Sequence, residues 1–199
     1  MNDRLNDFGK LMQILKSDST VLEFGSGFST YLFHFSKKIK SLTTVEEFLE
    51  YLPPISDNSF KSIVLQTQEI EYNGIKTKKF GDTSKILKEK FDLIYIDGPQ
   101  TPSSGLFAAP NIDIFNTDKS NLIFTIIAID VRFNTVIETH KLLSGSHRMY
   151  LSRRFKSNLN KFENLDKNFV RDYEEHGFGL KLTTLFIPRT FSFTDRFTI

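Results

Sequence analysis

The sequence predicts an α/β fold with a mostly parallel sheet, and three observations support this. Short apolar runs end in glycine or an acidic residue and recur at intervals of roughly 20 to 40 residues. Segments with apolar residues three and four positions apart lie between them, as in amphipathic helices. The run 91–99, FDLIYIDGP, is almost continuously apolar, which is typical of a central strand covered on both faces. Such alternation of strands and helices indicates βαβ units.

The first half of the chain is expected to begin with a helix and to continue with alternating strands and helices. A helix over 3–17 is expected from the spacing of Leu5, Phe8, Leu11, Met12 and Leu15. Strands are expected at 20–25, at 40–47, within 61–72 and at 91–99. A helix is expected over 28–38, with Ser26, Ser29 or Thr30 available to cap its N-terminus.

The second half begins with the same alternation and then departs from it. A strand at 121–131 is followed by a segment at 132–145 with helical spacing and a glycine stop. Two more strands are expected at 147–155 and 180–188, separated by a helix on Phe162, Leu165, Phe169 and Tyr173. The last segment alternates as an edge strand would, with Phe191, Phe193, Phe197 and Ile199 on one face. Pairing of this strand with a second copy would form a homodimer, but docking of the strand in the sheet of its own chain explains the pattern equally well.

Length and composition indicate that the whole chain forms a single domain. The 199 residues are expected to form a single unit, with an N-terminal helix at 1–18, a core at 19–143 and C-terminal strands with a helical insertion at 144–199. Because cysteine is absent, disulfides, thiolate metal sites and thiol nucleophiles are excluded. The charged N-terminus does not resemble a secretory signal, and the apolar run 122–129 is too short to cross a bilayer. We therefore expect a soluble cytoplasmic protein.

A glycine turn follows the first strand, within VLEFGSGFST at 21–30. Gly25 and Gly27 allow the backbone to turn sharply and to approach a ligand closely, and the helix that follows offers unpaired N–H groups. In an open parallel sheet, ligands bind outside the carboxyl ends of the strands. Taken alone, the turn is also compatible with a tight connection that binds nothing.

Glu46 strengthens the case for a ligand. It ends the second strand about twenty residues after the turn, where a carboxylate can accept hydrogen bonds from ribose hydroxyls. The alternative, a solvated helix start, is the one we prefer for Glu47. A nicotinamide cofactor would require a third glycine where this chain has Thr30, and the acidic Glu23 disfavours a nearby pyrophosphate. A carboxylate beside the turn suits a ligand with positive charge, such as S-adenosylmethionine.

The motifs that follow one another over roughly residues 20–143 are VLEFGSGFST, TTVEE, FGDTSKILKEKFDLIYIDGP and IIAIDV. In this order and spacing they resemble the motifs of class I S-adenosylmethionine-dependent methyltransferases. The I-D-G-P ending is most similar to catechol-type O-methyltransferases and to methyltransferases of bacterial glycans or secondary metabolites. The resemblance implies a Rossmann-like, doubly wound, seven-stranded sheet, mostly parallel with an antiparallel last strand, and helices on both faces.

The resemblance also implies a cofactor site at the turn. The residues implied at the methionine end of the cofactor are Glu23, Gly25, Ser26 and Gly27, and Ser29 belongs with them as a cofactor-binding residue. Glu46 would accept from the ribose, and Asp82 from the adenine amino group. Asp97 would reach both the methyl group and the acceptor. For Asp82 and Asp97, the alternative is an ordinary turn with an aspartate cap.

The resemblance implies methyl transfer by direct displacement, with O-methylation of a small molecule or glycan precursor as the expected reaction. A hydroxyl acceptor needs a base or a metal ion. In catechol-type relatives this is Mg²⁺, and Asp97 and Asp130 match two of its ligands. The third position is Val131, so the sequence disfavours a divalent metal, with Asp113 or Asn134 as substitute ligands if one binds.

Two further residues have candidate roles in the reaction, each with an alternative. Asp130 could orient the acceptor or cap the following helix. His176 lies in the variable region that relatives use for acceptors and is a candidate general base.

Other functions remain open from the sequence. The basic residues Arg148, Arg153, Arg154, Lys156 and Lys161 could contact phosphates, but on a strand Arg153 and Arg154 would face opposite sides. Nucleic acid is therefore a disfavoured partner, behind a small-molecule or glycan acceptor. The alternatives to a methyltransferase of small molecules are a noncatalytic nucleoside-binding module, an RNA methyltransferase and an NAD-dependent oxidoreductase.

Overall fold

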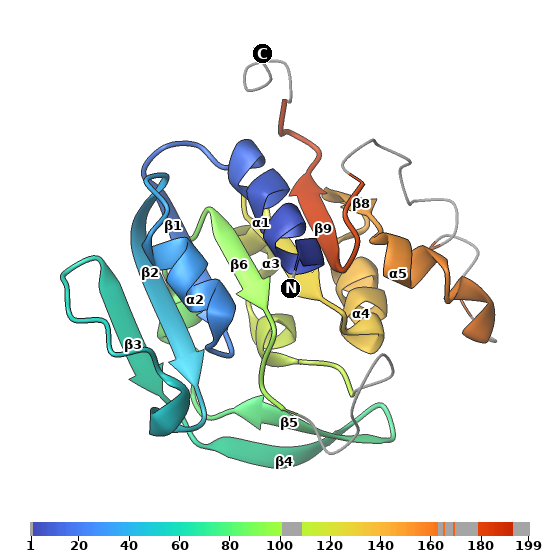
Figure 1. The fold of residues 1–199 in the computed structure, drawn as a ribbon. Coiled ribbons are helices and arrows are strands. Elements are labelled where there is room, and N and C mark those ends of the chain that lie inside the picture. Colours follow the sequence, from blue (N-terminus) through green and yellow to red (C-terminus); the bar gives the residue numbers. More distant parts are fainter. Residues whose placement is uncertain (1, 101–108, 163–164, 166–168, 170–178, 193–199) are drawn as a thin grey trace.

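The fold is given by a computed structural model that describes residues 2–100, 109–162, 165, 169 and 179–192. One sheet contains seven strands, in the order β3-β2-β1-β6-β7-β9-β8 (Figure 1). Their bounds are β1 Ser19–Phe24, β2 Ile39–Glu46, β3 Phe60–Val64, β6 Leu93–Ile96, β7 Ile126–Asp130, β8 His147–Tyr150 and β9 Thr183–Pro188. The first five in space are parallel, and β9 runs antiparallel to both β7 and β8. The predicted Rossmann-like sheet with an antiparallel last strand is confirmed.

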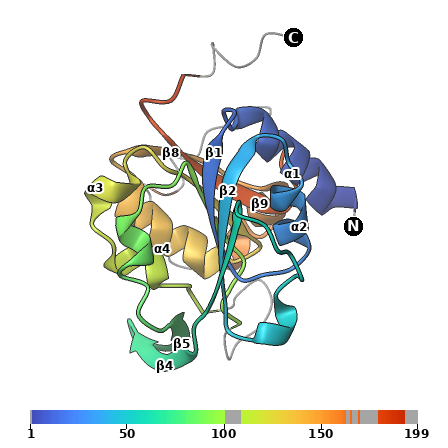
Figure 2. The same cartoon turned by 90° about the vertical axis from the view of Figure 1, so that its left-hand side faces the viewer.

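Helices cover both faces of the sheet, as Figures 1 and 2 show. Helices α1 (Asn2–Ile14) and α2 (Phe28–His34) cover one face, where Leu11 and Phe33 pack with Val21 of β1. Helices α4 (Phe133–Leu143) and α5 (Arg153–Lys156) lie on the other face, with Leu22 of the same strand. Because side chains of a strand alternate, both faces are apolar and the strand reads as a continuous run.

Helix α1 is fixed to the start of β9 by one buried carboxylate. Asp7 accepts hydrogen bonds from the backbone N–H groups of Lys181, Leu182 and Thr183 at 2.7–3.0 Å. Lys181 Nζ also lies 2.6 Å from Oδ1 of Asp3, in the first turn of the helix. These contacts join residues that are far apart in sequence and set where the first turn of α1 lies.

The segment 61–72, expected to hold one strand, holds parts of two. Strand β3 ends at Val64, and Thr67–Tyr72 (β4) forms a separate hairpin with Ile75–Phe80 (β5). The two turn residues are Asn73 and Gly74, with φ angles of 50° and 78°. Positive φ at both positions is typical of a type I′ turn, which connects the strands of a hairpin with a two-residue loop. Figure 1 shows the hairpin below the carboxyl ends of the parallel strands. A 3₁₀ turn, η2 (Ile86–Lys88), then leads to β6.

Two other expected strands are shorter than predicted. Strand β7 starts at Ile126, because the preceding residues form helix α3 (Lys119–Leu122), which Asp118 caps by accepting from the Ser120 N–H. Strand β8 ends at Tyr150, and the Ser152 hydroxyl caps α5 by accepting from Phe155 N–H. Arg153 and Arg154 therefore lie on a helix, and the prediction that they face opposite sides of a strand is wrong.

The remaining elements agree with the expected order. Helices α1 and α2 end three and four residues before the expected ends, 17 and 38. Short 3₁₀ turns follow β2 (η1, Leu49–Tyr51), precede α3 (η4, Asp113–Asn116) and follow α5 (η5, Leu159–Lys161). Most of the expected helix over 162–173 and of the last segment, 191–199, lies outside the described residues, although Phe191 packs against the α1 side of the core.

Candidate functional site

The strand order reverses between β1 and β6, and the glycine turn lies at this point. Along the chain β1 leads outward to β2 and β3, whereas β6 leads the other way to β7. Such a switch point leaves a crevice at the carboxyl ends of the strands, where α/β proteins bind ligands. Gly25 directly follows β1, and Gly98 lies two residues beyond β6.

Gly25 and Gly98 touch backbone to backbone. A Cβ on Gly25 would lie 2.7 Å from Gly98 N, and one on Gly98 would lie 2.6 Å from Gly25 Cα. Gly25 also has φ of 86°, a left-handed conformation that residues with a side chain rarely adopt. At Gly27, by contrast, a Cβ would meet no atom of the described residues within 4 Å. One glycine of the turn is thus required for packing, and the other faces open space.

Glu46 holds the turn in place. Its Oε2 accepts from the backbone N–H of Ser26 at 2.7 Å and lies 2.9 Å from the Ser26 hydroxyl. Its Oε1 accepts from the N–H groups of Glu47 at 2.6 Å and Phe48 at 3.3 Å. The Ser26 hydroxyl has a second acceptor, the Tyr51 carbonyl oxygen, at 2.8 Å. The structure therefore brings Glu46 to the turn itself, where the sequence analysis expected it at the ribose, and occupies its carboxylate with protein donors.

Glu23 is completely buried beneath the turn. Its carboxylate accepts from the hydroxyls of Ser29 at 2.5 Å, Thr30 at 2.7 Å and Thr44 at 2.9 Å. Burial raises its pKa to about 7, against the lowering effect of these hydroxyls. Thr30 also accepts from the Gly27 N–H at 2.9 Å, so the predicted capping hydroxyl is connected to Glu23. This network links β1, β2 and the start of α2.

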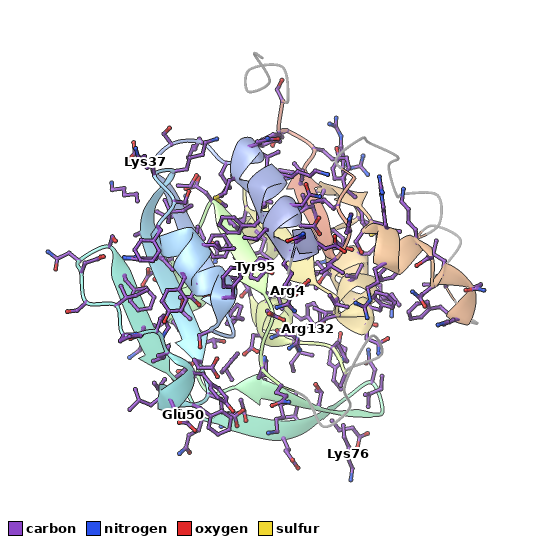
Figure 3. All side chains as sticks on the ribbon, in the orientation of Figure 1. Arg4, Lys37, Glu50, Lys76, Tyr95 and Arg132 are labelled. Carbon is purple, nitrogen blue, oxygen red and sulfur yellow. The ribbon has the colours of Figure 1, made fainter. Side chains whose placement is uncertain are left out.

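Asp97 and Asp130 come together at the ends of β6 and β7, next to two arginines. Arg4 Nη2 lies 2.9 Å from Asp130 Oδ2, although both Asp130 oxygens are buried and accept no hydrogen bond from the described residues. Arg132 donates to the carbonyl oxygens of Asp97 and of Pro99, at 2.9 Å for Pro99. Figure 3 shows Arg4, Tyr95 and Arg132 in this central region.

The charges of this cluster act on one another. Burial raises the pKa of Asp97, and the Arg132 and Arg4 charges oppose the rise. Burial and the Asp97 charge together raise the pKa of Asp130 to about 6. Tyr95 is also buried, and burial and the Asp130 charge place its pKa well above the ordinary value. The protonation state of each of these groups thus depends on the charges of the others.

The residues around Asp97 and Asp130 do not fit a divalent metal. Val131, where the expected ligand pattern needs an oxygen donor, has an apolar side chain and an unusual positive φ of 44°. No group of three or more metal-binding side chains occurs among the residues that the structure describes. Two guanidinium groups lie next to these residues, Arg4 at the Asp130 carboxylate and Arg132 at the Asp97 carbonyl oxygen. Asn134, the proposed substitute ligand, lies in the first turn of α4.

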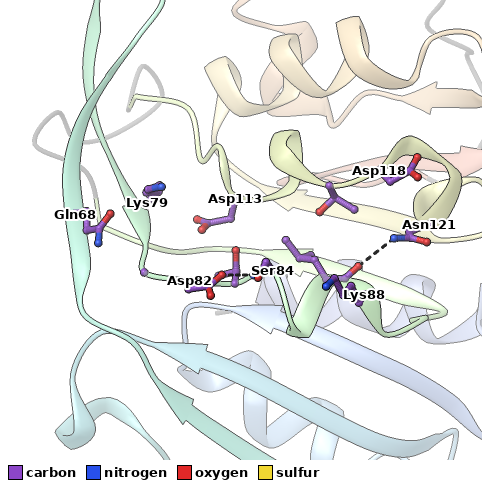
Figure 4. Close-up of a pocket in the computed structure, with 12 residues that line it drawn as sticks. Gln68, Lys79, Asp82, Ser84, Lys88, Asp113, Asp118 and Asn121 are labelled. Atoms are coloured by element: carbon purple, nitrogen blue, oxygen red, sulfur yellow. Dashed lines mark hydrogen bonds between the residues drawn. The ribbon is translucent and has the colours of Figure 1, made fainter.

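Asp82 and Asp113 line a different pocket, of about 620 Å³ (Figure 4). It lies between the β4–β5 hairpin, η2 and α3, and no residue of the glycine turn lines it. Asp82 is exposed and accepts from the Ser84 N–H at 3.0 Å, and hydrogen bonds from the Ser84 hydroxyl and N–H lower its pKa. Asp113 is buried and accepts from the Phe80 N–H at 3.1 Å, and burial raises its pKa to about 7.

A second cavity lies on the α1 and α2 side of the sheet. Its lining includes Arg4, Phe28, Ser29 and Tyr95, and its volume is only about 20 Å³. This is room for about one water molecule. The side chains of Arg4 and Phe28 in this lining are half-exposed.

Histidines contribute little to the described part of the site. His176, the candidate base, lies outside the described residues. His34 pairs with Asp57 at 3.1 Å, and His140 packs edge-on against Phe169. His147 is buried, and burial lowers its pKa.

Sequence reasoning missed three residues of the site, Arg4, Arg132 and Asn111. Asn111 donates from its side chain to the Gly98 carbonyl oxygen. Arg132 carried a signal, because it directly follows the predicted strand-end pair Asp130-Val131. Arg4 carried none, since it reaches Asp130 only through the packing of α1.

Comparisons with known proteins give no family. Neither the protein family models nor the curated proteins contain a match. Among solved structures, a spermidine synthase in complex with a transition-state analogue is similar, with a TM-score of 0.48, 10% identity and 94% of this chain covered. A dimethyladenosine transferase from Plasmodium falciparum has a TM-score of 0.42, 11% identity and 92% coverage. The chain spans 62% and 61% of these two proteins.

The N-methyltransferase NodS from Bradyrhizobium japonicum WM9 is also similar, with a TM-score of 0.39 and 10% identity over 92% of this chain and 93% of its own. With identities near 10% and TM-scores below 0.5, these similarities carry no information on substrate. Separately, no helix in the described part of the chain is both long and apolar enough to span a membrane.

Proposed function

We propose that this chain binds S-adenosylmethionine and transfers its methyl group to a hydroxyl of a small molecule or glycan precursor. The observation that carries the proposal is the contact of Gly25 with Gly98 at the switch point of the sheet. This contact joins the turn held by Glu46 to the strand end that bears Asp97. The four motifs that resemble class I methyltransferases surround this point, and the observed sheet is the one that the resemblance implies.

The turn offers room and charge for such a cofactor. Gly27 faces open space, so a ligand can approach the start of α2 closely. The carboxylates of Glu46 and Asp97 lie beside the turn and suit a ligand with an ammonium and a sulfonium group, whereas Glu23 is buried beneath the turn and bonded to three hydroxyls. When bound, S-adenosylmethionine supplies an activated methyl group, and the chain must align it with the acceptor and exclude water.

Glu46 can accept a ribose hydroxyl at small cost. Its carboxylate contacts four donors, but one of them, the Ser26 hydroxyl, lies equally close to the Tyr51 carbonyl oxygen. If Ser26 donates to Tyr51, one position on Glu46 Oε2 is released while the backbone N–H of Ser26 remains bound. We propose that Asp82 accepts a hydrogen bond from the adenine amino group. This assignment rests on the resemblance alone, because Asp82 lines the pocket of about 620 Å³ and not the glycine turn.

Asp97 and Asp130 would hold the acceptor in this scheme. Direct displacement needs no covalent residue on the enzyme, only a positioned oxygen in line with the methyl group and sulfur. Oδ1 of Asp130, the oxygen that Arg4 does not contact, accepts no hydrogen bond from the described residues and can accept one from an acceptor hydroxyl. Asp97→Asn should therefore reduce turnover more than cofactor affinity.

Isothermal titration calorimetry with S-adenosylhomocysteine tests the cofactor assignment. Glu46→Ala should weaken binding by about 1–3 kcal/mol, because ribose hydroxyls lose a charged acceptor. Glu50→Ala is the matched control, since Glu50 is exposed on η1 and removes the same charge four residues away. Equal affinities of both variants would refute the ribose assignment.

A nucleoside-binding module without turnover is the second candidate, because the cavity lined by Arg4 and Tyr95 has room for only about one water. Both candidates predict stabilisation by the cofactor, but only an enzyme releases S-adenosylhomocysteine from S-adenosylmethionine when a pool of acceptors is added. An oxidoreductase would instead be stabilised by NAD(H) in the same thermal unfolding assay.

A further inference from the structure

Each of the two carboxylates at the ends of β6 and β7 is accompanied by a guanidinium. Arg4 reaches Asp130 from α1, with Nη2 2.9 Å from Oδ2. Arg132 follows β7 and donates to the backbone on both sides of Gly98, at Asp97 and Pro99. Two formal negative charges are thus matched by two positive charges from side chains.

The positions of both arginines are set by the fold. Arg132 is held next to Asp97 by hydrogen bonds to two backbone carbonyl oxygens. Arg4 lies one helical turn before Asp7, and residues three apart lie on the same side of a helix. Asp7 is bonded to three consecutive N–H groups at the start of β9, so it fixes the side of α1 that carries Arg4.

We propose that Arg4 and Arg132 take the place of a divalent cation at this site, and that the site excludes Mg²⁺ and Mn²⁺ while both are present. A hard divalent cation binds where oxygen ligands carry uncompensated negative charge. Here Arg4 is ion-paired with the Asp130 carboxylate, and Arg132 is bonded to the backbone carbonyl oxygen of Asp97, so a metal would be repelled by two neighbouring guanidinium groups.

The proposal rests on the proposed function only where it concerns the acceptor. A metal ion can hold an acceptor through two neighbouring oxygens, whereas Arg4 presents N–H donors from a half-exposed side chain. An acceptor with a single hydroxyl is then sufficient. The charge pairing itself requires no cofactor and can be tested on the free protein.

The test is Mn²⁺ binding, followed by the electron paramagnetic resonance signal of the free ion. The wild type should show no saturable site in the millimolar range. Arg4→Met should gain Mn²⁺ affinity by at least about tenfold, because a unit positive charge is removed from beside Asp130. Adding Asp130→Asn to Arg4→Met should abolish the gain.

Two controls separate charge from general disturbance. Arg4→Lys keeps the positive charge and should bind no more Mn²⁺ than the wild type. Lys16→Met removes an ammonium that lies 2.6 Å from Asp92 and is about as exposed as Arg4, and it should also gain nothing, because the carboxylate there offers one ligand. Circular dichroism verifies that each variant is folded.

Three results would overturn the proposal: wild-type Mn²⁺ binding that Asp130→Asn removes, no gain in folded Arg4→Met, or an equal gain in Arg4→Lys. These outcomes are independent of the proposed function. Calorimetry with S-adenosylhomocysteine measures cofactor binding separately, so uptake of the nucleoside together with wild-type Mn²⁺ binding would reject only the arginine proposal.

Discussion

Gly98→Ala is the substitution for which the structure predicts the clearest loss of stability. The new Cβ would lie 2.6 Å from Gly25 Cα and 2.8 Å from Gly25 N. Both atoms belong to the backbone at the end of β1, so no side chain can rotate away. Overpacking of a filled interior costs about 1–3 kcal/mol, and we expect about 3 kcal/mol here because two strand ends must separate.

Gly25→Ala should cost more than Gly98→Ala. It introduces a clash of the same kind, 2.7 Å from Gly98 N, and also places a side chain at φ of 86°. The left-handed conformation adds about 1–2 kcal/mol for a residue with a Cβ. Gly27→Ala is the matched control from the same turn, where a Cβ meets nothing within 4 Å and stability should remain close to that of the wild type.

The assay is urea denaturation followed by circular dichroism, in which a change of midpoint at constant slope reports a change in the free energy of unfolding. The expected order of stability is wild type and Gly27→Ala, then Gly98→Ala, then Gly25→Ala. The reasoning is wrong if Gly98→Ala unfolds at the same urea concentration as Gly27→Ala.

Two more predictions concern buried carboxylates. The folded pKa of Glu23 is about 7 against an ordinary value of 4.5, so its contribution to stability falls as pH rises from 4.5 to 7 and is constant above. Glu23→Gln should remove this dependence and increase the free energy of unfolding at pH 8 by up to about 3 kcal/mol. Asp7→Asn should reduce it by about 3 kcal/mol, because an amide cannot accept from all three N–H groups with a full charge. Asp3→Asn removes an exposed ion pair of the same helix and should change the free energy of unfolding little.

The two carboxylate predictions can fail separately. Denaturation curves at pH 4.5, 6 and 8 that show the same difference between Glu23→Gln and the wild type would mean that Glu23 does not titrate in this range. An Asp7→Asn variant as stable as Asp3→Asn would mean that the bonds to the start of β9 do not hold α1.

The sequence predicted those parts of the site that depend on local pattern. Glu46 and Asp97 end apolar runs, and the carboxyl ends of neighbouring parallel strands meet by geometry, so their convergence follows from strand positions alone. The Asn73-Gly74 hairpin was not predicted, although this dipeptide is a strong turn signal, because the expectation of one strand within 61–72 left out the break between β3 and β4.

Contacts that depend on packing between distant segments could not be predicted from the sequence. Arg4 pairs with Asp130 across 126 positions of sequence, and no local pattern indicates which face of α1 points there. The filled carboxylate of Glu46 is a further example, since spacing predicted its place but not that Ser26, Glu47 and Phe48 would donate to it. Hydrogen-bond partners follow from the final geometry rather than from residue type.

The most direct test of the proposed function is calorimetric titration of the folded wild-type chain with S-adenosylhomocysteine. The account predicts saturable binding of one nucleoside per chain, weakened in Glu46→Ala and unchanged in Glu50→Ala. Absence of binding by a protein that unfolds cooperatively would contradict it, because the turn at Gly25 and Gly27 would then serve only to connect β1 to α2.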